Sequence, residues 1–252
     1  MLDDTLLEVV GLGHSFGAVT VLSNVNLNIP RAGLVGLIGP NGSGKTTLFN
    51  LISGYIEPRV GKVLFGGRCM SGMPVEDRSR QGLVRTFQTP RVFESMTVIE
   101  NIMTGCAKSG GGIFAEMFAL PSAKAARREM VERASEACTR FGLWELRDAP
   151  TKTLPAGQRR VLEIARAVVG RPQLLMLDEP SSGLNDSEVR ALEHWIEQLR
   201  GDGIAVLLVS HDMELMGAVD TVHLLYNGEL LVSGDMVSLQ NDSRVRDVYL
   251  GV

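Results

Sequence analysis

The sequence predicts an α/β fold with a mainly parallel sheet, an antiparallel β part and an inserted helical subdomain. An apolar strand at residues 34–38 leads through a glycine-rich turn into a helix, and strands alternate with helices again after Pro172. Between these two regions, apolar residues recur at helical spacing. Over 252 residues we therefore expect one domain, 1–252, with an α/β lobe at 1–90 and 166–252 and the helical subdomain at 91–165.

Each element is predicted from its own pattern. Alternating or continuous apolar residues predict strands, and apolar residues three or four positions apart predict helices. The expected strands are 7–12, 19–29, 34–38, 63–65, 84–87, 174–177, 205–209, 222–226 and 230–232. The expected helices of the α/β lobe are 46–52, 187–199 and 213–219.

The helical subdomain contains one clearly amphipathic segment. Ser122 is its expected N-cap. Its expected apolar face consists of Ala126, Met130, Ala134, Ala137 or Cys138, and Phe141. We expect the charged face opposite to be solvated, and Gly110 to Gly112 to be a flexible connector.

Composition and charge exclude several classes of protein. The 25 Lys and Arg against 29 Asp and Glu give a net charge of -4, so no strong positive field favours nucleic acid. Three widely spaced cysteines, Cys69, Cys106 and Cys138, suggest neither disulfides nor a zinc site, and we expect reduced thiols in the core. No apolar run approaches the ~18 residues that span a bilayer. The acidic N-terminus lacks the features of a secretory signal, so we expect a cytoplasmic chain.

Residues 39–46 read Gly-Pro-Asn-Gly-Ser-Gly-Lys-Thr and fit the phosphate-binding pattern G-x-x-x-x-G-K-[ST]. The pattern stands between a buried strand and a helix, a context that argues against a merely glycine-rich turn. The glycines let backbone N–H groups surround phosphate oxygens, and the following helix adds its positive dipole end. Lys45 would then reach the β and γ phosphates, and the Thr46 hydroxyl would help to coordinate Mg²⁺.

A second landmark of phosphate chemistry is the apolar strand 174–177, which ends in Asp178 and Glu179. Asp178 is suited to orient Mg²⁺ through its water shell, and Glu179 to point at the water that attacks the γ-phosphate. Two acids at a strand end are sometimes only a helix N-cap. The glycine-rich turn upstream favours the catalytic interpretation.

Between the two landmarks, Leu154-Pro155-Ala156-Gly157-Gln158 opens an apolar helix whose N-terminus is suited to another anion. The order of the three segments resembles that of the ATP-binding subunits of ATP-binding-cassette (ABC) transporters, and the resemblance covers essentially the whole chain. It implies a P-loop NTPase core, ATP and Mg²⁺ as ligands, and ATP hydrolysis coupled to transmembrane transport.

The resemblance also assigns site residues, position by position. Phe16 is similar to the aromatic residue that stacks on adenine, Gln88 to the Q-loop glutamine that senses Mg²⁺ and water, and His211 to the switch histidine at the γ-phosphate. The nucleotide would be bound by Phe16, Asn41, Gly42, Ser43, Gly44, Lys45, Thr46, Thr47 and Gln88, and the metal by Thr46, Gln88 and Asp178. The catalytic set would be Glu179, His211, Gln88 and Lys45.

Two segments depart from the family's pattern. The usual LSGGQ signature has Pro155 and Ala156 here, although Gly157 and Gln158 are kept. Asn185 replaces the usual aspartate of the D-loop. In the family these segments complete the ATP site of a partner subunit, and losing one charge-assisted hydrogen bond there would weaken the closed dimer by about 1.5 to 3 kcal/mol.

The resemblance further implies partners and a location. We expect transmembrane permease subunits docked around residues 91–94, a second ABC ATPase (this chain or a paralogue) and, indirectly, a substrate-binding protein, with no nucleic acid. The chain would lie peripherally on the cytoplasmic face of the inner (plasma) membrane. Gly112-Ile113-Phe114, the helix with Arg159 to Arg166, and Val248 to Gly251 resemble the ATPases of branched-chain amino-acid importers.

Three alternatives remain open. Within the family, the chain could be a urea or lipopolysaccharide-transport ATPase. A soluble ABC ATPase acting on nucleic acid or ribosomes is disfavoured by the acidic charge and the single cassette. A small-molecule kinase with a P-loop would lack the signature helix and the late His211.

Overall fold

The computed structural model describes residues 5–106 and 121–250. The chain divides into two compact units. The α/β unit comprises Met1–Arg85, Gln173–Ser182 and Asp186–Val252, and the helical unit comprises Thr86–Pro172 and Gly183–Asn185. The sequence predicted a helical subdomain at 91–165, and these domain boundaries stay a prediction.

The first sheet of the α/β unit is antiparallel. Its strands are β1 (Thr5–Phe16), β2 (Val19–Pro30), β4 (Val60–Phe65) and β5 (Arg68–Cys69), in the order β2-β1-β4-β5. Buried and exposed residues alternate along the second half of β2, as expected for a strand with one face in the core. This sheet is the antiparallel β part predicted from the sequence.

The second sheet is mainly parallel. Its strands are β3 (Leu34–Ile38), β6 (Leu83–Arg85), β7 (Leu174–Asp178), β8 (Ala205–Val209), β9 (Thr221–Tyr226) and β10 (Glu229–Gly234), in the order β10-β9-β3-β8-β7-β6. Every residue of β3, β7 and β8 is buried, which explains their continuous apolar sequences. Because these three neighbours are parallel, their carboxyl ends share one edge of the sheet.

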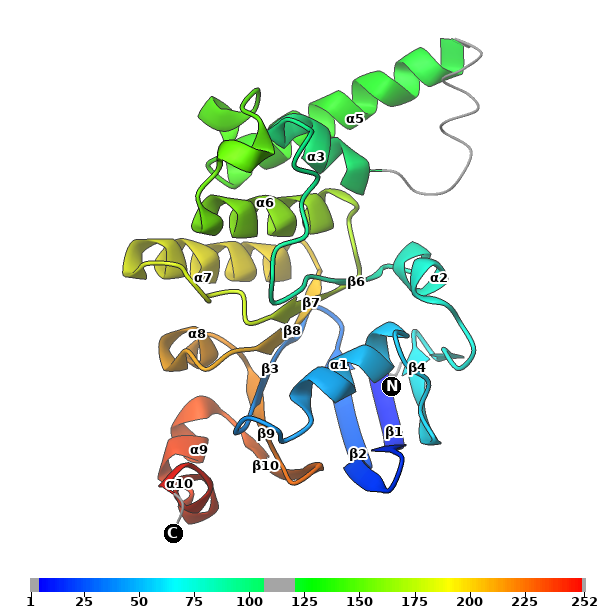
Figure 1. Cartoon of the computed structure of the whole chain (residues 1–252), viewed down its shortest axis with the longest axis vertical. Coiled ribbons are helices and arrows are strands. Elements are labelled where there is room, and N and C mark those ends of the chain that lie inside the picture. The colour runs from blue at the N-terminus through cyan, green and yellow to red at the C-terminus, as the bar shows by residue number, and fades with distance from the viewer. Residues whose placement is uncertain (1–4, 107–120, 251–252) are drawn as a thin grey trace. The chain divides into compact units, whose positions relative to one another are not determined.

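The helices of the α/β unit are α1 (Lys45–Ser53), α2 (Val75–Arg80), α7 (Asp186–Gly201), α8 (Met213–Gly217), α9 (Met236–Asn241) and α10 (Ser243–Leu250). One apolar cluster joins α1 to both sheets, with Leu27 from β2, Phe49 from α1 and Leu207 from β8 among its members. Helices α9 and α10 contact each other and the β9–β10 hairpin (Figure 1). The core of this unit therefore packs the middle and the end of α1 against both sheets.

The carboxyl end of α1 is held by a buried arginine. The Arg78 guanidinium is 1% exposed and donates to the carbonyl oxygens of Leu51 and Ile52 at 2.9 and 2.8 Å. It also donates to Met73 O at 2.9 Å and Met70 O at 2.8 Å. These four bonds tie the last turn of α1 to the segment that precedes α2.

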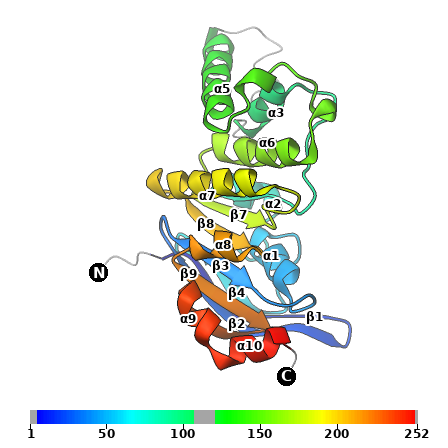
Figure 2. The same cartoon turned by 90° about the vertical axis from the view of Figure 1, so that its left-hand side faces the viewer.

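The helical unit contains α3 (Val98–Gly105), α5 (Pro121–Arg140) and α6 (Ala156–Val169), which contact one another (Figure 2). Two 3-10 turns, Trp144–Leu146 and Thr151–Thr153, connect α5 to α6. The N-terminus of α3 has a capping box: the Thr97 hydroxyl accepts from Glu100 N, and the Glu100 carboxylate accepts from Thr97 N.

The predicted fold class is confirmed, and strands 34–38 and 205–209 have the predicted limits. Three local expectations are wrong. Helix α5 begins at Pro121, so Ser122 is inside the helix rather than its N-cap. The strand expected at 84–87 ends at Arg85, so Phe87 lies outside it. Cys69 is exposed, in contrast to Cys106 and Cys138, which are buried free thiols.

Some expectations lie outside the described residues, namely the connector Gly110 to Gly112 and the segment Gly112-Ile113-Phe114. Ala134, Ala137 and Cys138 are buried on α5 as predicted, whereas the predicted face residue Met130 is only partly buried. Phe141 is also buried, but it lies just after the helix, which ends at Arg140. Among the residues that the structure describes, no helix is long and apolar enough to cross a membrane.

Candidate functional site

The turn between β3 and α1 requires glycine at its ends. Gly39 has a φ of 153°, and a Cβ there would lie 2.2 Å from Leu225 O. Gly44 has a φ of 108°, and a Cβ there would lie 2.7 Å from a methyl carbon of Leu22. The turn therefore takes a path that other residues cannot follow, and it delivers the chain to the start of α1.

The N-terminus of α1 is open to an anion. Its N-cap is Gly44, no side chain caps it, and its first turn contains no acidic residue. The Ser43 hydroxyl in the same turn is buried, and its oxygen has no hydrogen-bond partner. Uncapped helix N–H groups beside an orphaned hydroxyl fit a phosphate group, which accepts from both.

Lys45 and Thr46 follow the turn. Lys45 Nζ donates to Gly39 O at 2.7 Å and to Pro40 O at 3.0 Å, so the ammonium group folds back over the turn. Burial lowers the pKa of Lys45, while the nearby carboxylates of Glu179 and Asp178 oppose that fall. Thr46 is exposed at the mouth of the turn, where its hydroxyl is accessible to a ligand.

Asp178 is the last residue of β7 and is buried. Its Oδ2 accepts from Arg85 Nη2 at 2.8 Å, and the two side chains are 10% and 6% exposed. The Asp178 side chain is therefore held by the Arg85 guanidinium. One carboxylate and one hydroxyl, from Asp178 and Thr46, are oxygen donors of the kind that Mg²⁺ prefers.

Glu179 has a left-handed backbone, with a φ of 48°. Its N–H donates to Val209 O at 2.9 Å, which extends the pairing of β7 with β8 by one residue. Its Oε1 lies 3.1 Å from His211 Nε2. Burial raises the pKa of Glu179, and His211 opposes the rise most among the neighbouring charges. Positive φ at a non-glycine residue is a strained backbone of the kind found at functional sites.

His211 follows β8 and is half-exposed at the same strand edge. The loop around it is fixed by Ser210, which is fully buried and whose Oγ lies 3.1 Å from Ser181 Oγ. Ser210 Oγ also accepts from Asp212 N at 3.0 Å, and Asp212 in turn caps α8. The structure thus brings together Lys45, Asp178, Glu179 and His211 at the carboxyl edge of the sheet.

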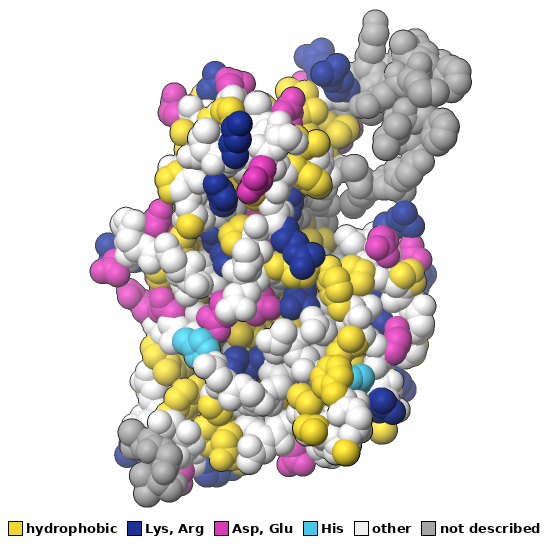
Figure 3. Space-filling view, viewed as in Figure 1, with side chains coloured by type: hydrophobic (Ala, Val, Ile, Leu, Met, Phe, Trp, Pro, Cys, Tyr) yellow, Lys and Arg dark blue, Asp and Glu magenta, His cyan; other side chains and the backbone are white. Residues whose placement is uncertain are grey.

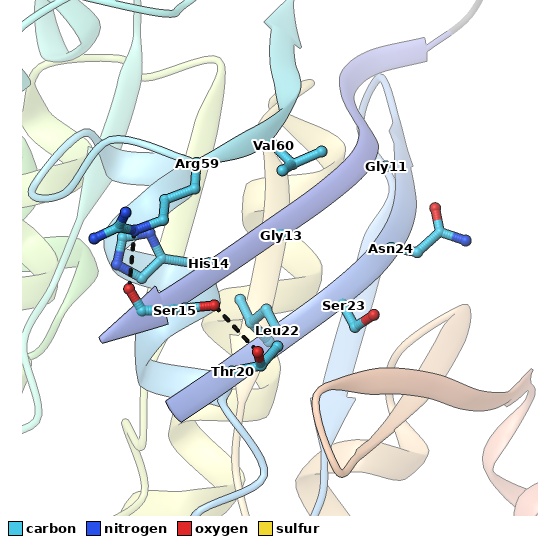
Figure 4. A pocket seen from close by; sticks show the side chains of 10 residues that line it. All are labelled: Gly11, Gly13, His14, Ser15, Thr20, Leu22, Ser23, Asn24, Arg59 and Val60. Carbon is cyan, nitrogen blue, oxygen red and sulfur yellow. Dashed lines mark hydrogen bonds between the residues drawn. The ribbon is translucent and has the colours of Figure 1, made fainter. Parts of the chain in front are cut away.

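Phe16 ends β1 and has an exposed ring, which is 53% accessible. The His14 ring contacts it edge-on, with the two centroids 4.7 Å apart. Beside this strand end, a cavity of about 410 Å³ lies between the β1–β2 hairpin and Arg59 (Figure 4). Arg59 Nε donates to Ser15 O at 3.1 Å, and Ser15 Oγ to Thr20 Oγ1 at 3.2 Å. The ring of Phe16, which is expected to stack on adenine, is thus exposed at the end of a strand that hydrogen bonds hold in place.

Gln88 belongs to the helical unit, and its backbone is fixed by α6. Arg160 donates to the carbonyl oxygens of Phe87 and Gln88, and its guanidinium also pairs with Glu163 at 3.3 Å. Glu163 Oε1 accepts from Arg91 N at 3.1 Å. Burial raises the pKa of Glu163 despite the arginines around it. We refer to Arg160 and Glu163 as the α6 clamp.

The signature-like segment forms the N-terminus of the same helix. Pro155 is the N-cap of α6 and supplies no side-chain hydrogen bond. Pro155 and Ala156 are exposed, Gly157 is buried and Gln158 is partly buried. Asn185 is exposed before α7. A helix therefore begins at this segment as predicted, without a side-chain cap and without an acidic residue in its first turn, and its role as an anion site stays a prediction.

The phosphate turn, the strand-end acids and the parallel strand order define a P-loop nucleotide-binding ATPase. The ABC transporter family model matches residues 22–182, and the chain belongs to this family.

Two relatives and one solved structure illustrate the match. The chain is 39% identical over 249 residues to LivG of Escherichia coli (strain K12), a high-affinity branched-chain amino acid transport ATP-binding protein, with 98% of each chain covered. It is 32% identical over 247 residues to LptB of Acidithiobacillus ferridurans, a lipopolysaccharide export system ATP-binding protein, covering 98% of this chain and 97% of LptB. The ADP conformation of MJ1267, an ATP-binding cassette of an ABC transporter, matches with a TM-score of 0.84 and 26% identity over 98% of this chain and 99% of that one. The chain is therefore a nucleotide-binding ATPase that powers a transporter.

Three sets of residues near these sites were not predicted. Arg85 pairs with Asp178 across two neighbouring strands, a contact for which the local sequence gives no signal. The α6 clamp had no signal beyond charge on a helix. Tyr249 of α10 lies close to the turn: burial raises its pKa, and a backbone hydrogen bond with Gly39 opposes the rise. Its place at the end of the chain gave no hint of this contact.

Proposed function

We propose that this chain is the ATP-binding and ATP-hydrolysing subunit of an importer of branched-chain amino acids. The observation that carries the proposal is the 39% identity to LivG over 98% of both chains. The site supports it, because a phosphate turn, two strand-end acids and a histidine meet at one edge of the α/β unit.

In this proposal, backbone N–H groups of residues 41–47 and Lys45 bind the phosphates of ATP, and the exposed ring of Phe16 stacks on adenine. Thr46 and Asp178 hold Mg²⁺, which when bound neutralises charge on the β and γ phosphates. The metal role that the family resemblance gives to Gln88 stays a prediction.

Glu179 accepts the proton of the attacking water, and the raised pKa brings this carboxylate closer to the working pH. His211 is placed to hold the Glu179 carboxylate in position, since their nearest atoms lie 3.1 Å apart. The strained backbone of Glu179 fixes the carboxylate at the strand end, so little reorganisation is required when ATP binds.

A second ATPase subunit completes each site in the proposed working state. The uncapped N-terminus of α6, with Pro155, Ala156, Gly157 and Gln158, would face the ATP of the partner, together with Asn185. Pro155 supplies neither a hydroxyl nor an N–H, so backbone groups and Gln158 would make this contact. Such a dimer closes on ATP and opens after hydrolysis.

Membrane permease subunits would receive this motion at the face that carries residues 91–94, and the chain would lie on the cytoplasmic face of the inner membrane. A substrate-binding protein would deliver the amino acid on the other side. The exposed Phe93 ring is 49% accessible, which fits a contact surface for such a partner. The visible face of the described residues intersperses Lys and Arg with Asp and Glu, without a continuous basic surface for nucleic acid (Figure 3).

The test is to reconstitute this chain in liposomes that contain ATP, together with the permease subunits that are encoded by the two permease genes nearest its own gene. We expect uptake of radiolabelled leucine, isoleucine or valine when the matching substrate-binding protein is present, and none with Lys45→Ala. ATP hydrolysis without amino-acid uptake would refute the proposed substrate.

The 32% identity to LptB favours lipopolysaccharide transport as the second candidate. The same liposomes, loaded with lipopolysaccharide and supplied with an acceptor, would then show ATP-dependent extraction of lipopolysaccharide and no amino-acid uptake.

A further inference from the structure

Arg85 is the last residue of β6, the edge strand next to β7. In the parallel register it pairs with Met176, two residues before Asp178. Side chains two residues apart in a strand lie on the same face, so Arg85 and Asp178 both lie on the face that α1 covers. The Arg85 side chain is only 6% exposed there. A buried arginine beside an apolar helix requires polar partners.

Both ends of the guanidinium group have such partners. Nη2 donates to Asp178 Oδ2 at 2.8 Å. Nη1 donates to Asn50 Oδ1 at 2.6 Å and lies 3.2 Å from Ser53 Oγ. The guanidinium carbon also lies 5.4 Å from the centre of the Phe49 ring. Arg85 therefore joins Asp178 of β7 to the second half of α1.

This link connects the two elements that carry the proposed metal ligands. Helix α1 carries Thr46 near its start and Asn50 one turn later, while β7 ends at Asp178. One carboxylate oxygen of Asp178 is occupied by Arg85, which leaves the other for the water shell of Mg²⁺. The fork geometry of the guanidinium fixes the carboxylate relative to α1, which a lysine with its single point charge does not do.

We propose that Arg85 is a positioning residue that sets the Mg²⁺ affinity of the nucleotide site by holding Asp178 at a fixed distance from α1. The proposal rests on the proposed roles of Thr46 and Asp178. A partner of this kind around a metal ligand typically changes metal affinity about 10- to 100-fold when it is removed.

The experiment measures ATPase activity against free Mg²⁺ at saturating ATP for Arg85→Lys. We expect the half-saturating Mg²⁺ concentration to rise about tenfold or more, with ATP affinity in EDTA changed by less than about twofold, because the phosphate turn is untouched. Asn50→Ala keeps the Arg85 charge but removes one anchor, and we expect a smaller shift in the same direction. If Arg85→Lys does not fold, Asn50→Ala decides the question.

Arg78→Lys is the matched control, since Arg78 is also buried against α1 but does not contact Asp178. It should lower the melting temperature without changing the Mg²⁺ dependence. Lowered stability with an unchanged Mg²⁺ dependence in Arg85→Lys and Asn50→Ala would overturn the proposal and leave Arg85 a structural residue.

Asp178→Asn separates this inference from the proposed function. If Asp178→Asn raises the Mg²⁺ requirement, Arg85→Lys in that background should add little further effect, because both act through one carboxylate. If Asp178→Asn leaves the Mg²⁺ dependence unchanged, the metal role of Asp178 itself is wrong. Additive effects of the two substitutions would overturn the positioning role alone.

Discussion

Arg78→Met removes a buried cation while filling nearly the same volume. Arg78 donates four hydrogen bonds to backbone carbonyls, of Leu51, Ile52, Met70 and Met73, at 2.8 to 2.9 Å. Methionine donates none of them. Charge-assisted bonds contribute about 1.5 to 3 kcal/mol each, but the desolvation that lowers the pKa of Arg78 offsets part of this gain. Removal of one partner from a buried charged network typically costs about 3 to 5 kcal/mol.

A loss of about 3 to 5 kcal/mol in a chain of this size lowers the melting temperature by about 6 to 20 °C, at about 2 to 4 °C per kcal/mol. Urea unfolding followed by circular dichroism measures the free energy, and scanning calorimetry the melting temperature. Arg78→Lys should recover part of the loss, because an ammonium group reaches one or two of the carbonyls. A change below about 1 kcal/mol for Arg78→Met, with an unchanged m-value, would show that the four bonds contribute little and would refute the reasoning.

Four further outcomes are expected. Glu179→Gln should bind ATP normally, hydrolyse it about 10² to 10⁴ times more slowly and accumulate dimer on size-exclusion chromatography; near-normal turnover contradicts the catalytic role. Lys45→Ala should weaken ATP binding itself, and an unchanged affinity by calorimetry counts against the phosphate turn. His211→Ala should slow single-turnover hydrolysis more than it weakens binding; the reverse pattern would make His211 a binding residue. Because burial raises the pKa of Glu179 in the folded state, its stabilising contribution is complete below the unfolded pKa and lost as pH rises through the folded pKa. Glu179→Gln should therefore melt at a higher temperature than the wild type at pH 7.5 but not near pH 4, and equal melting at pH 7.5 contradicts the raised pKa.

Sequence patterns predicted the elements that are long or fully buried. Strands 34–38 and 205–209 are continuous apolar runs, and their limits follow directly from burial on both faces. The strand β5 was not predicted, because two residues establish no periodicity. The short helices α2, α9 and α10 were not predicted either. The Ser122 cap was wrong because Pro121 suits the first helical turn, where a missing N–H costs nothing.

Local sequence patterns also predict only some of the residues of the candidate site. Asp178, Glu179 and His211 lie at or just after strand ends, and Lys45 follows β3 through the glycine-rich turn, so local patterns predict their common edge. Arg85 joins that group only through the pairing of β6 with β7, which brings together positions 93 residues apart. No local pattern encodes such a contact. The residue roles that follow from the family resemblance stay predictions until the variants are measured.

The α6 clamp has a consequence for the evolution of the loop after β6. Arg160 grips Phe87 and Gln88 by their carbonyl oxygens, and Glu163 grips Arg91 by its N–H. Every residue has a carbonyl group and nearly every residue has an N–H group, so these hydrogen bonds do not depend on which side chains the loop carries. Mutations can thus change the side chains of this loop to suit a different membrane protein, while the path of its main chain stays the same.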